Sequence, residues 1–182
     1  MSGKQTLYEG RFLHLVKKNN WEYVSRPNIT GIAAMVPITQ ENKLVILEQY
    51  RRPVDNLVIE FPAGLVGDVA AFADETIELG ANRELIEETG YEAGELHHLF
   101  DSPPSPGICS EIISWYLAVK LTKVGPGGGD ETEDIRIHEV SLADAHAFLG
   151  ERQAAGCLLD PKVFLGLYYA QRYLTGQSIA FS

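Results

Sequence analysis

The sequence predicts one α/β domain in which helices cover a sheet. Three observations lead to this prediction: strand-like apolar runs come first, a helix with apolar residues every fourth position follows, and further strands precede two C-terminal helices. A chain of 182 residues is long enough to bury one substantial core. No internal repeat interrupts this order, so the elements are expected to form layers of a single domain.

Composition excludes several classes of protein. A formal net charge of -10 argues against general binding to nucleic-acid backbones, because neutralising phosphates requires clustered Lys and Arg. No apolar run approaches the roughly 20 residues that span a bilayer, and the first residues lack the pattern of a signal peptide. Cys109 and Cys157 have no metal-ligand spacing and are expected to be free, buried thiols. We therefore expect a cytoplasmic protein.

The strands are predicted from apolar runs between polar turns. Residues 7–27 read as a hairpin with a polar turn at residues 17–20. A hairpin this small is not stable alone, so we expect it to pack on a partner. Further strands are predicted at residues 31–38, 44–49, 57–61, 112–121 and 135–140.

Three helices are predicted. The first covers residues 74–89, with Asp74 as N-cap, Gly90 as a left-handed C-terminal residue, and a core-facing stripe of Ile77, Ala81 and Leu85. The others cover residues 142–151 and 161–173, the last opened by Asp160 as N-cap and Pro161 at the first helical position.

The first helix carries a crowded acidic face. The helical repeat places Glu84, Glu87 and Glu88 within about 100 degrees of one another. Such like-charge pairs cost a few tenths of a kcal/mol each, so the crowding favours a counter-charge. Oxygen ligands without His or Cys favour a hard ion, Mg²⁺ before Zn²⁺. The alternative is a solvated acidic surface.

Residues 83–91 resemble the core of the Nudix box: an Arg-Glu pair, an aliphatic residue, two adjacent glutamates, a Gly and a hydrophobic residue. Glu75, with seven residues between it and Arg83, matches the upstream glutamate. The opening glycine departs from the family, because Gly64 is followed by ten residues before Glu75 and the alternative, Gly67, by seven. We align on Gly64, since residues 60–65 resemble the approach to the box in the ADP-ribose and sugar-nucleotide branch. The insertion then lengthens the loop at residues 66–73.

The resemblance implies an α/β/α sandwich with a mixed central sheet. It also implies an N-terminal β segment, residues 1–35, packed or swapped in a homodimer, and a hydrolase domain at residues 36–182. Mg²⁺, with Mn²⁺ as a substitute, would bind the Ala63 carbonyl, Glu84 and Glu88, with Glu87 as a further ligand or neighbour. Arg83 would orient the carboxylates through a salt bridge.

Four residues are predicted to choose the substrate, by resemblance to the same branch. Trp21 would stack on the base, although a core aromatic on a strand is the alternative. Arg51 would grip the diphosphate bidentately, and Arg52 would assist it or remain a surface charge. Pro106, 15 residues after Tyr91, stands about where ADP-ribose pyrophosphatases carry a proline.

The Gly-rich loop at residues 125–130 lacks the spacing of a phosphate cradle, so we interpret it as a flexible lid. By resemblance, Glu131 after it would be the general base and Glu133 a metal ligand, with Glu133 as the alternative base. The His97-His98 pair and His138 are expected to have no catalytic role.

The sequence thus predicts Mg²⁺-dependent hydrolysis of a nucleoside diphosphate sugar, ADP-ribose or a nucleotide hexose. The products would be a nucleoside monophosphate and a sugar phosphate. Alternatives are an enzyme acting on nucleoside triphosphates or dinucleotides, and a non-catalytic sensor of nucleotide sugars. Intact box glutamates disfavour the sensor.

Overall fold

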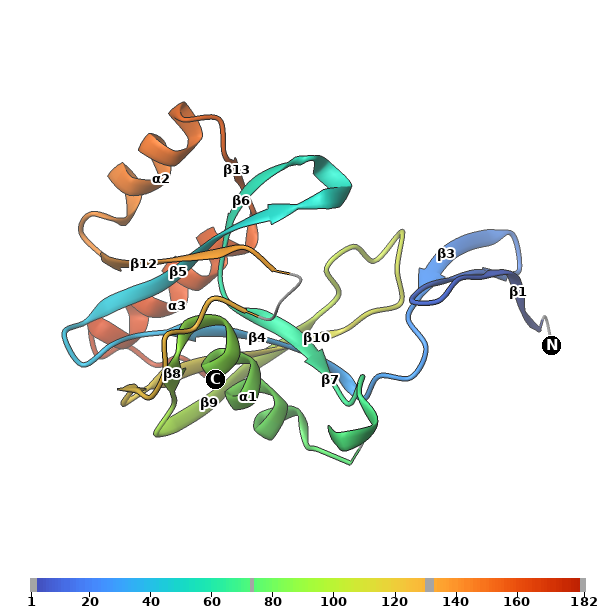
Figure 1. Ribbon diagram of the computed structural model, residues 1–182, viewed down its shortest axis with the longest axis horizontal. Helices are drawn as coiled ribbons and strands as arrows, with labels where there is room; N and C mark the ends of the chain where they lie inside the picture. The colour runs from blue at the N-terminus through green and yellow to red at the C-terminus, as the bar shows by residue number, and fades with distance from the viewer. Residues whose placement is uncertain (1–2, 73, 130–132, 181–182) are drawn as a thin grey trace.

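The structure is a computed structural model that describes residues 3–72, 74–129 and 133–180. A compact body holds most of the strands and all the α-helices, and a small N-terminal sheet projects from it (Figure 1). The strands are β1 (Lys4–Glu9), β2 (His14–Lys18), β3 (Trp21–Ser25), β4 (Gly31–Pro37), β5 (Lys43–Arg51), β6 (Asn56–Glu60), β7 (Ala63–Val66), β8 (Tyr91–Glu92), β9 (Glu95–Ser102), β10 (Ile113–Val119), β11 (Thr122–Lys123), β12 (Ile135–Ser141) and β13 (Leu158–Leu159). The helices are α1 (Ile77–Thr89), α2 (Ala145–Ala154) and α3 (Lys162–Leu174), with short 3-10 turns η1 (Arg52–Val54) and η2 (Ala70–Phe72).

Two four-stranded sheets form the body, in the orders β7-β4-β10-β9 and β12-β5-β6-β13. The pairs β4/β10 and β6/β13 are parallel and the others are antiparallel, so the sheets are mixed. Within the described ranges, none of the helices has both the length and the apolar character needed to cross a membrane.

Strand β4 separates two hydrophobic clusters, because successive side chains of a strand point to opposite faces. Ala34 and Val36 join the cluster that includes residues of α2 and α3. Ala33 and Met35 join the cluster that includes Ala81 and Leu85 of α1. Helices therefore cover both faces of the strands, and the predicted α/β/α layering is confirmed.

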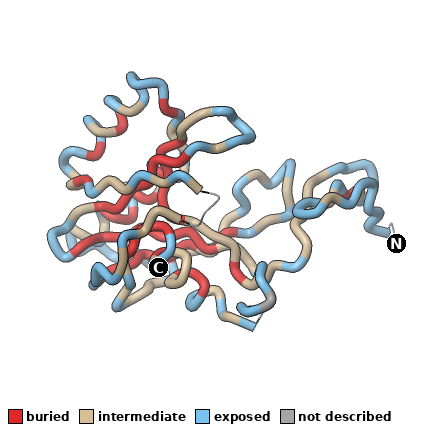
Figure 2. The backbone as a smooth tube through the Cα atoms, in the orientation of Figure 1, coloured by how far each residue is buried: buried red, intermediate tan, exposed pale blue. Residues whose placement is uncertain are grey.

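The N-terminal sheet, β1-β2-β3, is largely exposed (Figure 2). It ends at Ser25, ahead of the limit near residue 35 expected from the sequence, because β4 already belongs to the body. Val24 and the segment before β10 connect the two parts: the Val24 N–H donates to the Ile108 carbonyl at 2.7 Å and the Ser110 N–H to the Val24 carbonyl at 3.0 Å. Its role in dimerisation stays a prediction.

Helix α1 begins later than expected. Its N-cap is Thr76, whose hydroxyl accepts from the Leu79 N–H at 3.3 Å, so the assignment of Asp74 was wrong. Glu75, the residue between Asp74 and Thr76, forms a salt bridge with Arg83 at 2.7 Å. The helix ends at Gly90 with φ of 72°, as predicted.

The later elements that were predicted are present, but their ends differ from the prediction. A turn in which the Ser141 hydroxyl donates to Asp144 delays α2 by three residues. Helix α3 begins at Lys162 with Pro161 as its N-cap, one residue later than predicted from Asp160, although the Asp160 carboxylate does accept from the Lys162 N–H at 2.8 Å. Sequence reasoning missed β9, an edge strand whose mixture of His, Asp and apolar residues is only partly buried. Cys157 is buried, whereas Cys109 is only partly so, and both thiols are free.

The contact between α3 and Phe61, the residue after β6, provides a test of the packing. A Cβ on Gly166 would lie 2.1 Å from the Phe61 ring, so Gly166→Ala should destabilise the fold by about 1–3 kcal/mol through overpacking. Gly150→Ala on α2 is the matched control, because nothing lies within 4 Å of its Cβ position. The control should be neutral or stabilising by roughly 0.5–1 kcal/mol. Urea unfolding measures both, and equal stability of the two variants would contradict this packing.

Candidate active site

A cavity of about 630 Å³ collects most of the predicted site residues. Its walls come from β5, β6, β7, α1, the segment before β12 and the start of α3. The predicted residues that line it are Arg51, Ala63, Arg83, Glu84, Glu87, Glu88 and Glu133. Three others, Trp21, Arg52 and Pro106, are not among the lining residues. Glu131 lies outside the described residues.

Arg83 contacts three carboxylates in and around the acidic face. Its guanidinium contacts Glu75 at 2.7 Å, Glu84 at 2.7 Å and Glu87 at 3.2 Å. It also donates to the Leu65 carbonyl at 3.1 Å and lies over the Phe72 ring, 4.7 Å from its centroid. These contacts raise the pKa of Arg83 and lower that of Glu75, with the hydrogen bond between the two as the largest cause. The guanidinium therefore holds three carboxylates in one arrangement.

Glu84 is packed directly against the backbone of Gly64. A Cβ at position 64 would fall 2.0 Å from the carboxyl carbon of Glu84, so only glycine leaves room for this side chain. Burial raises the pKa of Glu84 to about 7, although Arg83 opposes the shift. The close approach makes Gly64 part of the site and fits the choice of Gly64 over Gly67 as the start of the motif.

Glu88 is the most deeply buried of the three helix carboxylates, with 3% of its surface exposed. One of its oxygens accepts from the Ala63 N–H at 3.0 Å. Burial is the main cause that raises the pKa of Glu88 well above its ordinary value, and the nearby carboxylates of Glu133 and Glu84 add to it. The position therefore favours an added positive charge.

Arg51 supplies a cation to the same cavity. Its guanidinium donates to Glu60 at 2.8 Å. The nearby negative charges of Glu88 and Glu133 act to raise the pKa of Arg51. Burial raises the pKa of Glu60, while Arg51 lowers it. Lys162 also lines the cavity and pairs with Asp160.

Sequence reasoning missed Glu60, Lys162 and Arg26 as lining residues. Glu60 stands at the approach to the motif and could have been suspected from its position. Lys162 and Arg26 carry no local signal, because only the tertiary fold brings α3 and the end of β3 to this cavity.

Gln49 on β5 holds the side chain of Glu133. The side-chain amide of Gln49, which is 4% exposed, donates to one carboxylate oxygen of Glu133 at 3.1 Å. The preceding glycines are held against α1 by backbone hydrogen bonds from Gly128 and Gly129. The interpretation of residues 125–130 as a flexible lid stays a prediction, and its last residue lies outside the described residues.

The histidines expected to have no catalytic role have partners outside this cavity. His97 contacts Glu95, and His98 contacts Asp101. His138 contacts the buried Glu48 at 3.2 Å.

Two predicted substrate markers meet outside the cavity. The Trp21 indole N–H donates to the Gly107 carbonyl at 3.1 Å, so the ring lies beside the turn that contains Pro106. Trp21 remains 62% exposed and is not a core aromatic. Arg52 lies in the exposed turn η1.

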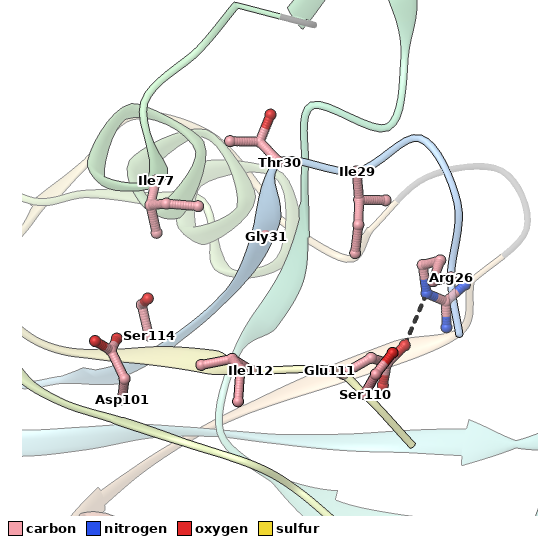
Figure 3. Close-up of a pocket in the computed structure, with 10 residues that line it drawn as sticks. All are labelled: Arg26, Ile29, Thr30, Gly31, Ile77, Asp101, Ser110, Glu111, Ile112 and Ser114. Carbon is pink, nitrogen blue, oxygen red and sulfur yellow. Dashed lines mark hydrogen bonds and ion pairs between the residues drawn. The ribbon is translucent and has the colours of Figure 1, made fainter. Parts of the chain in front are cut away.

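A second hollow of about 390 Å³ adjoins the first. Arg26 and Glu111 line both and form a salt bridge at 3.0 Å (Figure 3). Asp101 and Ser114 lie at the end of this hollow away from that pair (Figure 3). The salt bridge thus stands between the two depressions.

The donor set fits a divalent cation. Among the residues described, no three carboxylate, histidine or cysteine side chains already close around one metal position. Oxygens of Glu88 and Glu84 are engaged by the Ala63 N–H and by Arg83. Burial nevertheless disfavours ionisation of both carboxyls, and a hard cation with oxygen ligands would relieve that penalty.

The fold and the cavity together define a class: an α/β/α protein in which the carboxylates of one helix and an arginine line the same cavity. The family model of the NUDIX domain matches residues 29–159, so the chain belongs to the NUDIX family.

Named relatives share much of the chain. The methanol dehydrogenase activator of Bacillus methanolicus is 36% identical over 78% of this chain and 72% of its own length. The ADP-ribose pyrophosphatase of Bacillus subtilis (strain 168) is 30% identical over 92% and 90%, respectively. The GDP-mannose pyrophosphatase of Escherichia coli (strain K12) is 32% identical over 78% and 73%. A crystal structure of ADP compounds hydrolase has a TM-score of 0.71 and 22% identity over 97% of this chain and 94% of that one, which shows a common fold.

Removing divalent cations should make stability depend on the ionisation of Glu84. Its pKa is about 7 in the folded chain and near 4.5 when unfolded, so folding takes up a proton between these values. Stability of the metal-free protein should therefore fall as pH rises from about 5 to 8. Thermal unfolding in the presence of chelator measures this effect. Over the same pH range, the melting temperature of Glu84→Gln should fall by several degrees less than that of the wild type, since 1 kcal/mol corresponds to roughly 2–4 °C.

Glu78→Gln on the exposed face of the same helix controls for the loss of one helix carboxylate. Identical pH slopes in the wild type and Glu84→Gln would contradict the assigned burial of Glu84.

Proposed function

We propose that the chain hydrolyses the pyrophosphate bond of nucleoside diphosphate sugars, ADP-ribose or nucleotide hexoses, to a nucleoside monophosphate and a sugar phosphate. The observation that carries this proposal is the presence, in one cavity, of the buried carboxylate of Glu88, the partly buried carboxylate of Glu84 and the guanidinium of Arg51. The carboxylates attract cations and the guanidinium attracts phosphate oxygens. Relatives named ADP-ribose and GDP-mannose pyrophosphatase support this class of substrate.

The proposed cofactor is Mg²⁺, with Mn²⁺ as a substitute. The Ala63 carbonyl, Glu84 and Glu88 would hold it, and Glu87 and Glu133 would be further ligands. When bound, the ion neutralises charge on phosphate oxygens and lowers the pKa of a coordinated water. Arg83 is proposed to orient the carboxylates, because its donors are already shared among Glu75, Glu84 and Glu87.

Arg51 is proposed to bind the diphosphate, assisted by Arg52. A guanidinium binds two phosphate oxygens at once, and Glu60 fixes this one through a 2.8 Å contact with Nε. Because this contact fixes Nε, it also sets the direction of the terminal nitrogens Nη1 and Nη2. Arg51 would hold the diphosphate while water adds to one phosphorus.

The general base is proposed to be Glu131, with Glu133 as the alternative. A carboxylate would take a proton from the attacking water as its oxygen bonds to phosphorus, and the bridging P–O bond would break. The departing phosphate leaves with the bridging oxygen. Gln49 supports this step by holding Glu133 at the edge of the cavity.

The N-terminal sheet is proposed to form a homodimer and to bind the nucleotide base. Its exposed apolar residues, Leu7, Tyr8, Phe12, Leu13, Leu15 and Trp21, are more than a sheet of this size would leave in water. Trp21 already lies against the loop that contributes Pro104 to the cavity. The two free thiols are typical of a reducing compartment, and we propose the cytoplasm.

A substrate panel tests the proposed reaction. With Mg²⁺, the wild type should convert ADP-ribose, or a nucleotide hexose such as GDP-mannose, to two monophosphates, and chelator should stop turnover. Glu88→Gln retains an acceptor for the Ala63 N–H but removes the charge, so kcat should fall by about 100-fold or more.

Glu78→Gln is the matched control on α1 and should retain activity. Phosphate release from dATP without cleavage of any nucleotide sugar would contradict the proposed substrate class, and full activity of Glu88→Gln would contradict the site.

Trp21→Ala tests the base-binding role. Stacking contributes about 1–3 kcal/mol per base, so KM should rise by roughly 5- to 150-fold while kcat changes little. Phe164→Ala, which removes an exposed aromatic of α3 that does not line the cavity, is the control and should leave KM unchanged. Steady-state kinetics measure the difference, and an unchanged KM for Trp21→Ala would remove this residue from substrate binding.

A further inference from the structure

The C-terminal end of α1 receives donors from a distant segment. The last four carbonyls of a helix lack partners within it. Here the Ile86 carbonyl accepts from the Gly90 N–H at 2.8 Å, and the Thr89 carbonyl from the Lys123 ammonium at 2.7 Å. The other two, on the carboxylate-bearing residues themselves, accept from the Gly-rich loop.

Successive N–H groups of that loop make these two bonds. Gly129 donates to the Glu87 carbonyl at 3.0 Å and Gly128 to the Glu88 carbonyl at 2.9 Å. Because the loop joins β11 to β12, it ties the metal-binding end of α1 to the start of a strand in another sheet (Figure 1).

Glycine is required for this docking. Gly127, Gly128 and Gly129 have φ of 71°, 109° and 78°, a run of conformations that L side chains rarely adopt. A Cβ on Gly127 would lie 2.4 Å from the backbone carbon of Thr89, and one on Gly129 would lie 2.3 Å from a carboxylate oxygen of Glu133. The loop thus packs on backbone at one end and on a site carboxylate at the other.

Glu133 is confined from two sides by these contacts. One oxygen accepts from the Gln49 amide, and the other lies against the Cα of Gly129. Glu88 is confined in the same way, by the Ala63 N–H at its carboxylate and the Gly128 N–H at its carbonyl. Both carboxylates line the same cavity.

We propose that residues 127–129 form a positioning strap, which fixes the carboxylates of Glu88 and Glu133 relative to each other and so sets divalent-metal affinity and turnover. The strap residues touch neither metal nor substrate in this scheme. They act through the end of α1 and through Glu133. The proposal deepens the proposed function and rests on it only for the effect on turnover.

Alanine variants of the strap test the proposal. Gly127→Ala and Gly129→Ala should weaken the affinity for Mn²⁺ alone, measured by calorimetry, by about 10- to 100-fold. With ADP-ribose or whichever nucleotide sugar the wild type cleaves, kcat should fall comparably while KM stays within about threefold. A purely structural role would lower stability without moving metal affinity in the folded protein.

Gly125→Ala is the matched control. It lies in the same loop, nothing stands within 4 Å of its Cβ position, and its N–H to the Gly90 carbonyl is retained. It should bind Mn²⁺ and turn over like the wild type. Wild-type Mn²⁺ affinity and kcat in folded Gly127→Ala and Gly129→Ala would overturn the strap.

Amide hydrogen exchange of the wild type tests the same claim without any variant. The Gly128 and Gly129 amides should be protected in metal-free protein and remain so with Mn²⁺. Exchange at the rate of an open loop would overturn the proposal even if the variants fail to fold. If the wild type cleaves no nucleotide sugar, the proposed function fails, whereas Mn²⁺ affinity and exchange still decide the strap.

Discussion

Burial of like charges at one end of α1 is the constraint on which the site depends. A carboxylate removed from water is costly unless a counter-charge or hydrogen bonds replace the water. Arg83 supplies the counter-charge for Glu75, Glu84 and Glu87, but Glu88 lies deeper and accepts from the Ala63 N–H. The resulting concentration of negative charge is the reason why we propose a divalent cation at this end of the helix.

The surroundings of α1 follow from holding those carboxylates in place. Gly64 leaves room for Glu84, and Phe72 returns from the inserted loop to cover the guanidinium of Arg83. The glycines at residues 127–129 bring donors to the helix carbonyls and confine Glu133. Three separate parts of the chain therefore pack around one short stretch of helix, two of them through backbone and one through an aromatic ring, which is how a rigid fold preorganises a site.

The layered fold and the acidic helix could be predicted from sequence because their signals are local. Apolar periodicity located α1 and the body strands, and the spacing of glutamates located the carboxylate face. Sequence patterns did not predict the features that depend on tertiary contacts. Asp74 was predicted as the N-cap of α1, but the hydroxyl of Thr76 makes that contact, and β9 is an edge strand with a mixed pattern. The Gly-rich loop was recognised as unusual, but its docking on α1 depends on a contact between distant segments.

We propose that oxygens of residues 63, 84 and 88 bind one divalent ion beside the diphosphate. The most direct measurement is anomalous diffraction from crystals containing Mn²⁺ and a non-hydrolysable nucleotide sugar analogue. An anomalous peak between the Ala63 carbonyl, Glu84 and Glu88, next to phosphate density near Arg51, is the predicted result. Mn²⁺ and phosphate located away from α1 would contradict this account.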